Sequence, residues 1–317
     1  MEPDRYPRTE DWIAMNAPPR ARNGLTVGVI GAGRVGTVLA AALAAAGHTV
    51  TAVTPTRTPE RLTALLPGVP VRPAPEVVGA ARDLLLLAVP DDSLAGLVND
   101  LATQVSDWPA GQVVAHPSGA HGLAVLSPVS ARGARPLALH PAMTFTGTPD
   151  DLARLPGTGY GVTAPDDVRA FATRLVADLR GHPEWLPESA RPLYHAALAH
   201  GANHLTTLVN EAADWLRAAG IGRPERILAP LLRAALENTL RHGDAALTGP
   251  VARGDTGTVT GHLDVLTAVA PESVPAYRAL AQRTTERAVA AGRLDPAAAR
   301  SLQAVLDPPV TAAGRAA

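Results

Sequence analysis

Two residue types are missing from the 317-residue sequence, and their absence limits the chemistry it can perform. Without cysteine, the chain has no disulfide bond, no thiolate nucleophile and no cysteine-ligated metal. Without lysine, it cannot form a Schiff base or use a lysine as a catalytic acid. Imidazole, carboxylate, hydroxyl and guanidinium groups must therefore carry the chemistry of the chain.

Strong charge and long apolar runs are missing as well. The formal net charge is −1, which argues against electrostatic binding to nucleic acid or to a membrane surface. No run approaches the roughly 18 apolar residues of a membrane span, and the first residues lack the apolar core of a secretion signal. We therefore expect a cytoplasmic protein with a small-molecule substrate.

The stretch 25–54 has the pattern of a strand, a glycine turn, an alanine-rich helix and a second strand. Gly31, Gly33 and Gly36 fit the G-x-G-x-x-G pattern at the junction of strand and helix. The first glycine of this pattern permits a tight turn, the second lets the backbone approach a pyrophosphate, and the third lets helix and strand pack closely. Because the free N–H groups of the helix start favour phosphate, the stretch predicts a dinucleotide site.

The second strand of this stretch ends without a carboxylate. Enzymes that use NAD usually carry Asp or Glu there to bind the ribose 2′-hydroxyl, whereas the first carboxylate here is Glu60. The hydroxyls of Thr54 and Thr56 and the guanidinium of Arg57 suit a 2′-phosphate, so we predict NADP(H) as the cofactor. The predicted cofactor-binding residues, including the end of the apolar strand 83–90, are Gly31, Gly33, Arg34, Val35, Gly36, Thr54, Thr56, Arg57, Val89 and Pro90.

The sequence pattern changes near residue 189. Before it, short apolar strands alternate with helices, and after it only helical periodicity is found. We predict an α/β fold in which an N-terminal Rossmann dinucleotide-binding domain is followed by an all-helical C-terminal domain, which by analogy forms a homodimer. The expected parts are a flexible segment at 1–23, the NADP-binding domain at 24–188, a helical substrate and dimerisation domain at 189–308, and a flexible tail at 309–317.

Polar groups at the carboxyl ends of two predicted strands are candidates for substrate binding. Ser118 lies in the stretch 116–122 after one strand, and His140 follows the next strand. Strand ends beside a nicotinamide supply substrate contacts, and imidazoles there can exchange protons near neutral pH. A structural role at the strand end is an equally good interpretation.

A long predicted helix, from 189 to 219, carries further candidates. At spacings of four, His195 and Asn203 lie on one face of this helix, with only Ala199 between them. His200 and His204 form a second pair at a spacing of four, which can bind zinc. Because no third ligand accompanies that pair, we predict no metal site.

The segment 247–259 is rich in glycine and threonine. Arg253 and the hydroxyls of Thr248 and Thr258 have the chemistry to bind a substrate carboxylate, and Asp255 lies beside them. The alternative interpretation is a loop between helices with a surface ion pair between Arg253 and Asp255.

Several motifs together resemble a bacterial Rossmann-like family whose C-terminal half is a domain of unknown function. They are GVIGAGRVG, LLLLAVPD, HPSGAHG, LHPAMTF, YHAALAHGANHLTTLVNEA and ALTGPVARGD, and the resemblance covers residues 24–305. The wider relatives are the 6-phosphogluconate dehydrogenase-like enzymes, among them β-hydroxyacid dehydrogenases, pyrroline-5-carboxylate reductase and ketopantoate reductase. The resemblance implies an NADP-dependent oxidoreductase.

The segment Asn203–Leu208 is similar to a helix motif of ketopantoate reductases. In that comparison His195 takes the place of the catalytic lysine, Ala199 that of an asparagine, and Asp255 is the nearest equivalent of a later carboxylate. The resemblance therefore implies that His195 protonates the product alkoxide and that Asn203 orients the carbonyl. The absence of the lysine is the one clear departure from the family pattern.

The resulting hypothesis is an NADPH-dependent reductase of a small 2-oxo acid, with 2-dehydropantoate (ketopantoate) as the first choice. That reaction gives pantoate in pantothenate biosynthesis. The alternatives are an imine or β-hydroxyacid oxidoreductase and an NADP-binding sensor without turnover. The expected residues are His195 and Asn203 for catalysis and Ser118, His140, Thr248, Arg253, Asp255 and Thr258 for substrate binding.

Overall fold

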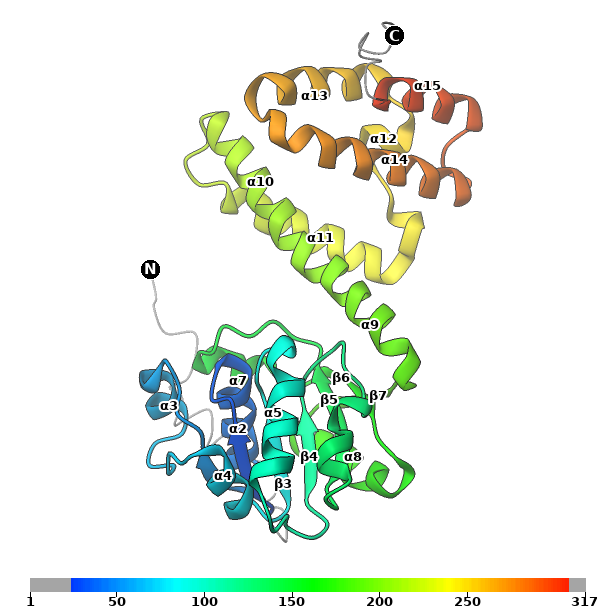
Figure 1. Ribbon diagram of the computed structural model, residues 1–317. Coiled ribbons are helices and arrows are strands. Elements are labelled where there is room, and N and C mark those ends of the chain that lie inside the picture. The colour runs from blue at the N-terminus through cyan, green and yellow to red at the C-terminus, as the bar shows by residue number, and fades with distance from the viewer. Residues whose placement is uncertain (1–23, 308–317) are drawn as a thin grey trace, which may run out of the picture. The chain divides into compact units, whose positions relative to one another are not determined.

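The computed structural model describes residues 24–307, so the predicted flexible segments at 1–23 and 309–317 lie outside the described residues. The chain divides into two compact units, the first ending at Ala199 and the second beginning at His200 (Figure 1). This division falls later than the domain boundary predicted at residue 188. The first helix after the sheet belongs to the α/β unit, because its first residue, Arg191, is buried there against the strands.

A seven-stranded sheet organises the first unit, in the order β2-β1-β3-β4-β5-β6-β7. The five strands from β2 to β5 are parallel, β6 runs antiparallel to β5, and β7 runs parallel to β6. The strands are β1 (Thr26–Ile30), β2 (Thr49–Val53), β3 (Leu84–Leu87), β4 (Val113–His116), β5 (Arg135–Pro141), β6 (Gly159–Thr163) and β7 (His182–Trp185). Because the chain crosses from β2 back over β1 to β3, the strand order reverses at β1, and ligands of such sheets bind there beside the carboxyl ends.

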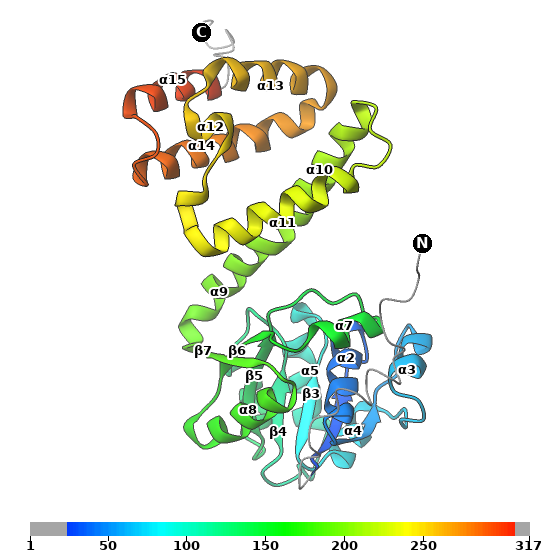
Figure 2. The same ribbon diagram turned by 180° about the vertical axis from the view of Figure 1, so that it is seen from behind.

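Helices cover both faces of this sheet (Figure 1 and Figure 2). One core includes α2 (Arg34–Ala45), α3 (Pro59–Leu65), α7 (Pro149–Arg154) and α8 (Asp166–Asp178), and the other includes α4 (Ala74–Ala80), α5 (Asp91–Gln104) and α6 (Ser127–Ser130). Side chains of β3 alternate between them: Leu84 and Leu86 enter the first core, and Leu85 and Leu87 enter the second. A strand buried on both faces explains the unbroken apolar run.

The helix predicted from 189 to 219 is interrupted. It consists of α9 (Arg191–Leu198), a π-helical turn at Ala199–Asn203 and α10 (His204–Ala218). A π-turn bonds each residue to the fifth one along the chain instead of the fourth. The α-helical spacing that put His195 and Asn203 on one face therefore does not hold through this turn.

The second unit is helical, and only part of it forms a core. It continues with α11 (Glu225–His242), α12 (Gly249–Arg253), α13 (Thr256–Val269), α14 (Val274–Ala290) and α15 (Pro296–Leu306). The core residues come from α12 to α15 and the segment before α15. No residue of α10 is buried, and Leu228 is the single buried residue of α11. Among the helices described between residues 24 and 307, none combines the length and apolar character needed to cross a bilayer.

Candidate functional site

The glycine turn after β1 has the geometry that a dinucleotide phosphate requires. Gly31 has a φ of +97°, which favours glycine, and a side chain there would clash with the carbonyl of Ala88. A side chain at Gly36 would clash with the carbonyl of Gly31, so glycine allows α2 to approach β1. A methyl group at Gly33, in contrast, would meet no atom within 4 Å. Gly33 thus leaves open space at the start of α2, where free N–H groups can bind a pyrophosphate.

The two threonines predicted to bind a 2′-phosphate make contacts within the protein. Thr54 is buried, and its hydroxyl oxygen accepts a 2.9 Å hydrogen bond from the N–H of Gly31. This happens because the end of β2 lies directly beside the end of β1. Thr56 accepts a 3.3 Å hydrogen bond from the N–H of Thr58, within the loop after β2. Thr54 therefore supports the glycine turn, and its contact with a phosphate stays a prediction.

Three arginines surround the loop after β2. Arg34 and Arg57 are exposed, and no carboxylate of residues 24–307 forms an ion pair with either. Arg61, which the sequence did not single out, donates to the hydroxyl of Thr58 at 2.8 Å and to the carbonyl of Gly147 at 3.1 Å. It therefore ties this loop to the segment before α7. Cations without a neighbouring carboxylate favour a phosphate at this position.

The other predicted cofactor residues border the glycine turn less directly. Val35, in the first turn of α2, and Val89, after β3, are both half-buried against the cores. A methyl group at Gly31 would lie 3.0 Å from Cγ1 of Val89, so Val89 lies beside the turn. Pro90 is exposed and occupies the N-cap position of α5.

His116 and Ser118 shape the loop that follows β4. Nδ1 of His116 accepts a 3.2 Å hydrogen bond from the N–H of Ser118, so its Nε2–H donates to the carbonyl of Gly122 at 2.9 Å. Burial lowers the pKa of His116 to about 4, which keeps the ring neutral near pH 7. Ser118 is buried, and its hydroxyl accepts a 3.1 Å bond from the N–H of His121. The structural interpretation of this stretch is therefore the better one, and Ser118 is not presented as a substrate ligand.

His140, at the end of β5, pairs with a tyrosine that the sequence analysis gave no role. Its Nδ1 lies 2.8 Å from the hydroxyl of Tyr194 on α9, and the two rings meet edge to face. Burial, followed by the neighbouring His195 and Arg191, lowers the pKa of His140 to about 4. Burial also raises the pKa of Tyr194. Near pH 7 the pair is therefore a neutral imidazole and a protonated phenol.

His195 joins this pair from the next position of α9. The ring centroids of His140 and His195 are 6.4 Å apart. Gly119 lies against both rings, because a methyl group there would be 2.8 Å from Cδ2 of His195 and 3.2 Å from Nε2 of His140. The structure thus gathers three groups from two distant segments, and we call them the His140–Tyr194–His195 cluster. A side chain larger than glycine at position 119 would displace its imidazoles.

Arg191 anchors the helix that carries this cluster. It is fully buried, and its guanidinium donates to the carbonyls of Ser118 (3.1 Å), Ala138 (3.1 Å) and Gly161 (3.0 Å) and to the hydroxyl of Thr163 (2.8 Å). Burial lowers its pKa, yet a guanidinium stays charged at neutral pH. The sequence analysis missed it, although its position four residues before His195 places it one helical turn away.

The remaining predicted substrate residues lie in the second unit. Asp255 caps α13, because its carboxylate accepts from the N–H of Thr258 at 3.1 Å and from its hydroxyl at 2.7 Å. These hydrogen bonds lower the pKa of Asp255. Thr248 and Arg253 are exposed at the two ends of α12. Asp255 and Thr258 therefore serve a helix cap, and the surface ion pair with Arg253 is not formed among the described salt bridges.

Asn203 and the two neighbouring histidines lie at the start of this unit. Asn203 is exposed at the end of the π-turn. His200 and His204 are exposed with their Nδ1 atoms 3.1 Å apart. No third metal-ligating side chain joins them within residues 24–307.

Two family descriptions match the chain in succession. A Rossmann-like domain matches residues 15–141, and a domain of unknown function, DUF2520, matches residues 158–284. The chain is therefore similar to a Rossmann-like domain in its first half and to DUF2520 in much of its second half. These matches confirm the predicted fold class, whereas similarity to ketopantoate reductase in particular is not among them.

Solved structures share this fold over most of their length. A Bacteroides fragilis protein assigned as an NADP oxidoreductase is 19% identical, with a TM-score of 0.69 over 83% of this chain and 98% of that chain. A reductive aminase from Aspergillus terreus, in complex with NADPH and ethyl levulinate, is 20% identical, with a TM-score of 0.61 over 89% and 99%. An imine reductase from Pseudomonas sp. is 21% identical, with a TM-score of 0.55 over 89% and 92%. At these identities the likeness establishes the fold, and no curated protein matches the chain.

Proposed function

We propose that the chain is an NADP(H)-dependent reductase of a small molecule that carries a C=O or C=N bond. The observation that carries the proposal is the His140–Tyr194–His195 cluster on the sheet edge that also holds the glycine turn. β1 and β5 belong to one parallel set, so their carboxyl ends lie on the same edge. A dinucleotide site and exchangeable protons on one edge are what a reductase needs.

The glycine turn and its surroundings fit NADP(H). The open position at Gly33 accommodates a pyrophosphate, and Arg34 and Arg57 offer guanidinium groups to a 2′-phosphate. The solved relatives with the same fold include an NADPH complex, which supports the same cofactor. When bound, NADPH supplies the hydride for the reduction. The chain supplies the phosphate contacts and the polar groups around the substrate.

In this proposal His195 donates the proton to the reduced group of the substrate. Its ring is half-exposed, whereas His116 and His140 are held neutral by burial. Tyr194 and His140 hold a second exchangeable proton beside it. Arg191 positions α9 and acts on the substrate only through the residues it holds.

Two substrate classes are carried forward. The first is a 2-oxo acid, with 2-dehydropantoate as the particular candidate. The similarity of Asn203–Leu208 to a helix motif of ketopantoate reductases supports it. The second class is an imine, and the imine reductase and reductive aminase among the relatives with this fold support it.

The test is NADPH oxidation by the full-length protein with 2-dehydropantoate, a cyclic imine, and a ketone mixed with an amine, with NADH in parallel. Turnover that prefers NADPH supports the reductase, and the accepted substrate decides between the classes.

His195→Ala should lower kcat by about 10²–10⁴-fold with NADPH affinity nearly unchanged, as expected for loss of a general acid. His200→Ala, an exposed histidine outside the cluster, is the matched control. An unchanged kcat in His195→Ala would contradict the assignment of His195 as the acid. NADPH binding without turnover of any substrate would favour a sensor.

We also infer a homodimer that forms through α10 and α11. Leu231 and Leu240 on α11 are 60% and 78% exposed, and Leu205 on α10 is 41% exposed. Exposed apolar side chains on two helices that have only one buried residue, Leu228, are typical of an association surface. A second copy of the chain offers a surface of the same character.

A further inference from the structure

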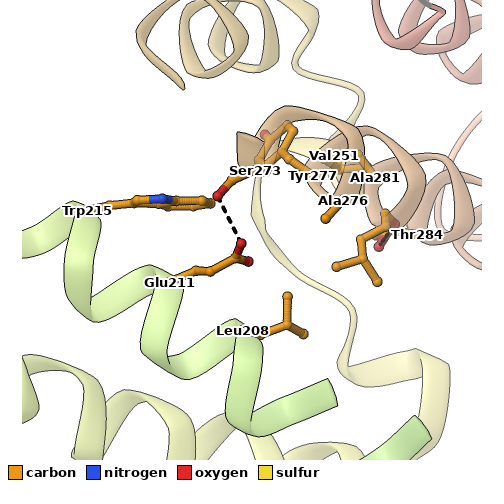
Figure 3. Close-up of a pocket in the computed structure, with 10 residues that line it drawn as sticks. Leu208, Glu211, Trp215, Val251, Ser273, Ala276, Tyr277, Ala281 and Thr284 are labelled. Carbon is orange, nitrogen blue, oxygen red and sulfur yellow. Dashed lines mark hydrogen bonds between the residues drawn. The ribbon is translucent and has the colours of Figure 1, made fainter. Parts of the chain in front are cut away.

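A cavity in the second unit is lined like a binding site for a small organic cation. It has a volume of about 260 Å³ and lies between α10 and α14 (Figure 3). This volume is slightly below the range of about 300–1,000 Å³ that is usual for drug-sized ligands, so the cavity suits a smaller molecule. Most of its wall is apolar, with Leu208, Val251, Ala276, Leu280 and Ala281 among the lining residues.

One carboxylate, that of Glu211, faces this apolar space from α10 (Figure 3). The hydroxyl of Ser273, which is 3% exposed, donates a 2.9 Å hydrogen bond to Oε1 of Glu211. This bond fixes the direction of the carboxylate and leaves its negative charge uncompensated. No arginine or histidine of residues 24–307 forms an ion pair with it.

The arginines that are nearest in sequence are bound elsewhere. Arg217 on α10 pairs with Asp214 at 2.6 Å, on the exposed side of the helix. Arg278 on α14 donates to three carbonyls at the end of α15, those of Val305, Leu306 and Asp307. A cation that neutralises Glu211 must therefore come from outside the described chain.

Two aromatic rings complete the wall around the carboxylate. Trp215 lies one turn after Glu211 on α10, and Tyr277 lies one turn after Ser273 on α14 (Figure 3). The hydroxyl of Tyr277 is bonded to Nδ1 of His262 at 2.8 Å, so its polar end is satisfied. Aromatic faces attract cations and are compatible with the alkyl groups of an ammonium ion.

We propose that this cavity binds a small organic ammonium ion, with its charge on Glu211 and its alkyl groups against Trp215, Tyr277 and the aliphatic wall. An anion would be repelled by the carboxylate. A neutral apolar ligand would bury the carboxylate without a partner, which is costly. The inference assigns a second site and does not depend on the reductase function.

The test is calorimetric titration of the full-length protein with tetramethylammonium, choline and benzylammonium. The neutral isostere of choline, 3,3-dimethylbutan-1-ol, serves as the uncharged control. The proposal expects at least one ammonium ion to bind and the alcohol to bind about tenfold or more weakly, which is the loss of one charge interaction in a partly desolvated site. Failure of all three ammonium ions to bind would overturn it.

Variants locate the bound ion. Glu211→Gln keeps the size of the side chain and its hydrogen bond from Ser273, and it should abolish the preference for the charged ligand. Glu272→Gln removes an exposed carboxylate next to Ser273 outside the cavity wall and should leave binding unchanged. His195→Ala should also leave it unchanged, which separates this site from the reductase site. If Glu272→Gln lost the preference for the charged ligand as completely as Glu211→Gln, the assignment of Glu211 would be overturned.

One rival source of the same chemistry is an arginine of a second copy of the chain. Sedimentation of the wild type and of Glu211→Gln distinguishes the two. The proposal expects the same dimer dissociation constant for both proteins. A clearly weaker Glu211→Gln dimer, together with no ammonium binding, would assign the cavity to the second copy and overturn the proposal.

Discussion

The two units of this chain use their apolar residues in different ways. In the unit that ends at Ala199, the sheet separates two cores, and its large aliphatic side chains are mostly buried. In the unit that begins at His200, the core is confined to α12–α15 and the segment before α15, and leucines of α10 and α11 remain exposed. The first unit therefore holds its candidate site with its own contacts. The second presents surfaces that need something further to cover them.

The largest expected effect tests whether the first unit is self-supporting. Arg191→Ala would leave three main-chain carbonyls without their donor, and we expect unfolding free energy to fall by about 4 kcal/mol. Urea unfolding measures the loss. Arg169→Ala removes an exposed arginine whose guanidinium lies 3.9 Å from the centre of the Trp185 ring, and should cost less than about 1 kcal/mol. Similar small losses in both variants would mean that the buried contacts of Arg191 do not hold the unit together.

The second prediction concerns acid and again affects the first unit. The folded His116 has a pKa of about 4, below the usual value of 6.5, so between these values the unfolded chain binds more protons. Stability should therefore fall as the pH drops from about 6.5 to 4, by at most about 3 kcal/mol for this residue. Urea midpoints at several pH values measure the slope. The slope should flatten in His116→Gln, and an unchanged slope would contradict the buried neutral imidazole.

The third prediction probes the exposed surface of the second unit. Leu231→Asp should raise the dimer dissociation constant about tenfold or more, because it places a charge in an apolar interface. Analytical ultracentrifugation measures the constant. Val71→Asp changes an apolar residue of the first unit that is 49% exposed, and it should leave association unchanged. A monomeric wild-type protein at all concentrations would end the dimer proposal.

The smallest effect is expected at the cofactor site. Arg57→Ala should reduce the preference for NADPH over NADH about tenfold, which corresponds to one hydrogen bond to a charged group. Ratios of kcat/KM with the two cofactors give the measurement. Arg72→Ala, which removes an exposed arginine paired with Glu76, should not change the ratio. If wild type and Arg57→Ala had the same ratio of kcat/KM with NADPH to kcat/KM with NADH, the 2′-phosphate contact would have to be assigned to another arginine.

Local patterns in the sequence predicted most of the fold. The glycine turn and the apolar run of β3 depend on neighbouring residues, and the structure has both where they were expected. The π-turn at 199–203 could not be foreseen, because this segment contains no large apolar side chain whose spacing would show the extra residue. It also undermines the alignment of His195 with Asn203.

The candidate site was predicted in fragments. His140 and His195 were each recognised, but their meeting at Gly119 depends on packing between segments far apart in the sequence. The sequence did not indicate that Arg191 is buried, because a buried arginine without a carboxylate partner is rare. The sequence around Asp255 has two interpretations, since an acidic residue followed three positions later by threonine also forms a helix cap, as it does here.

The burial of Arg191 has an electrostatic consequence. Its charge is held by neutral carbonyls and a hydroxyl, and no carboxylate among residues 24–307 forms an ion pair with it. A guanidinium cannot be titrated at any pH at which the fold survives, so Arg191 contributes a positive charge to the sheet edge that does not vary with pH. In the proposed reductase, this charge would stabilise negative charge that develops on a substrate oxygen, without any change in protonation of the protein.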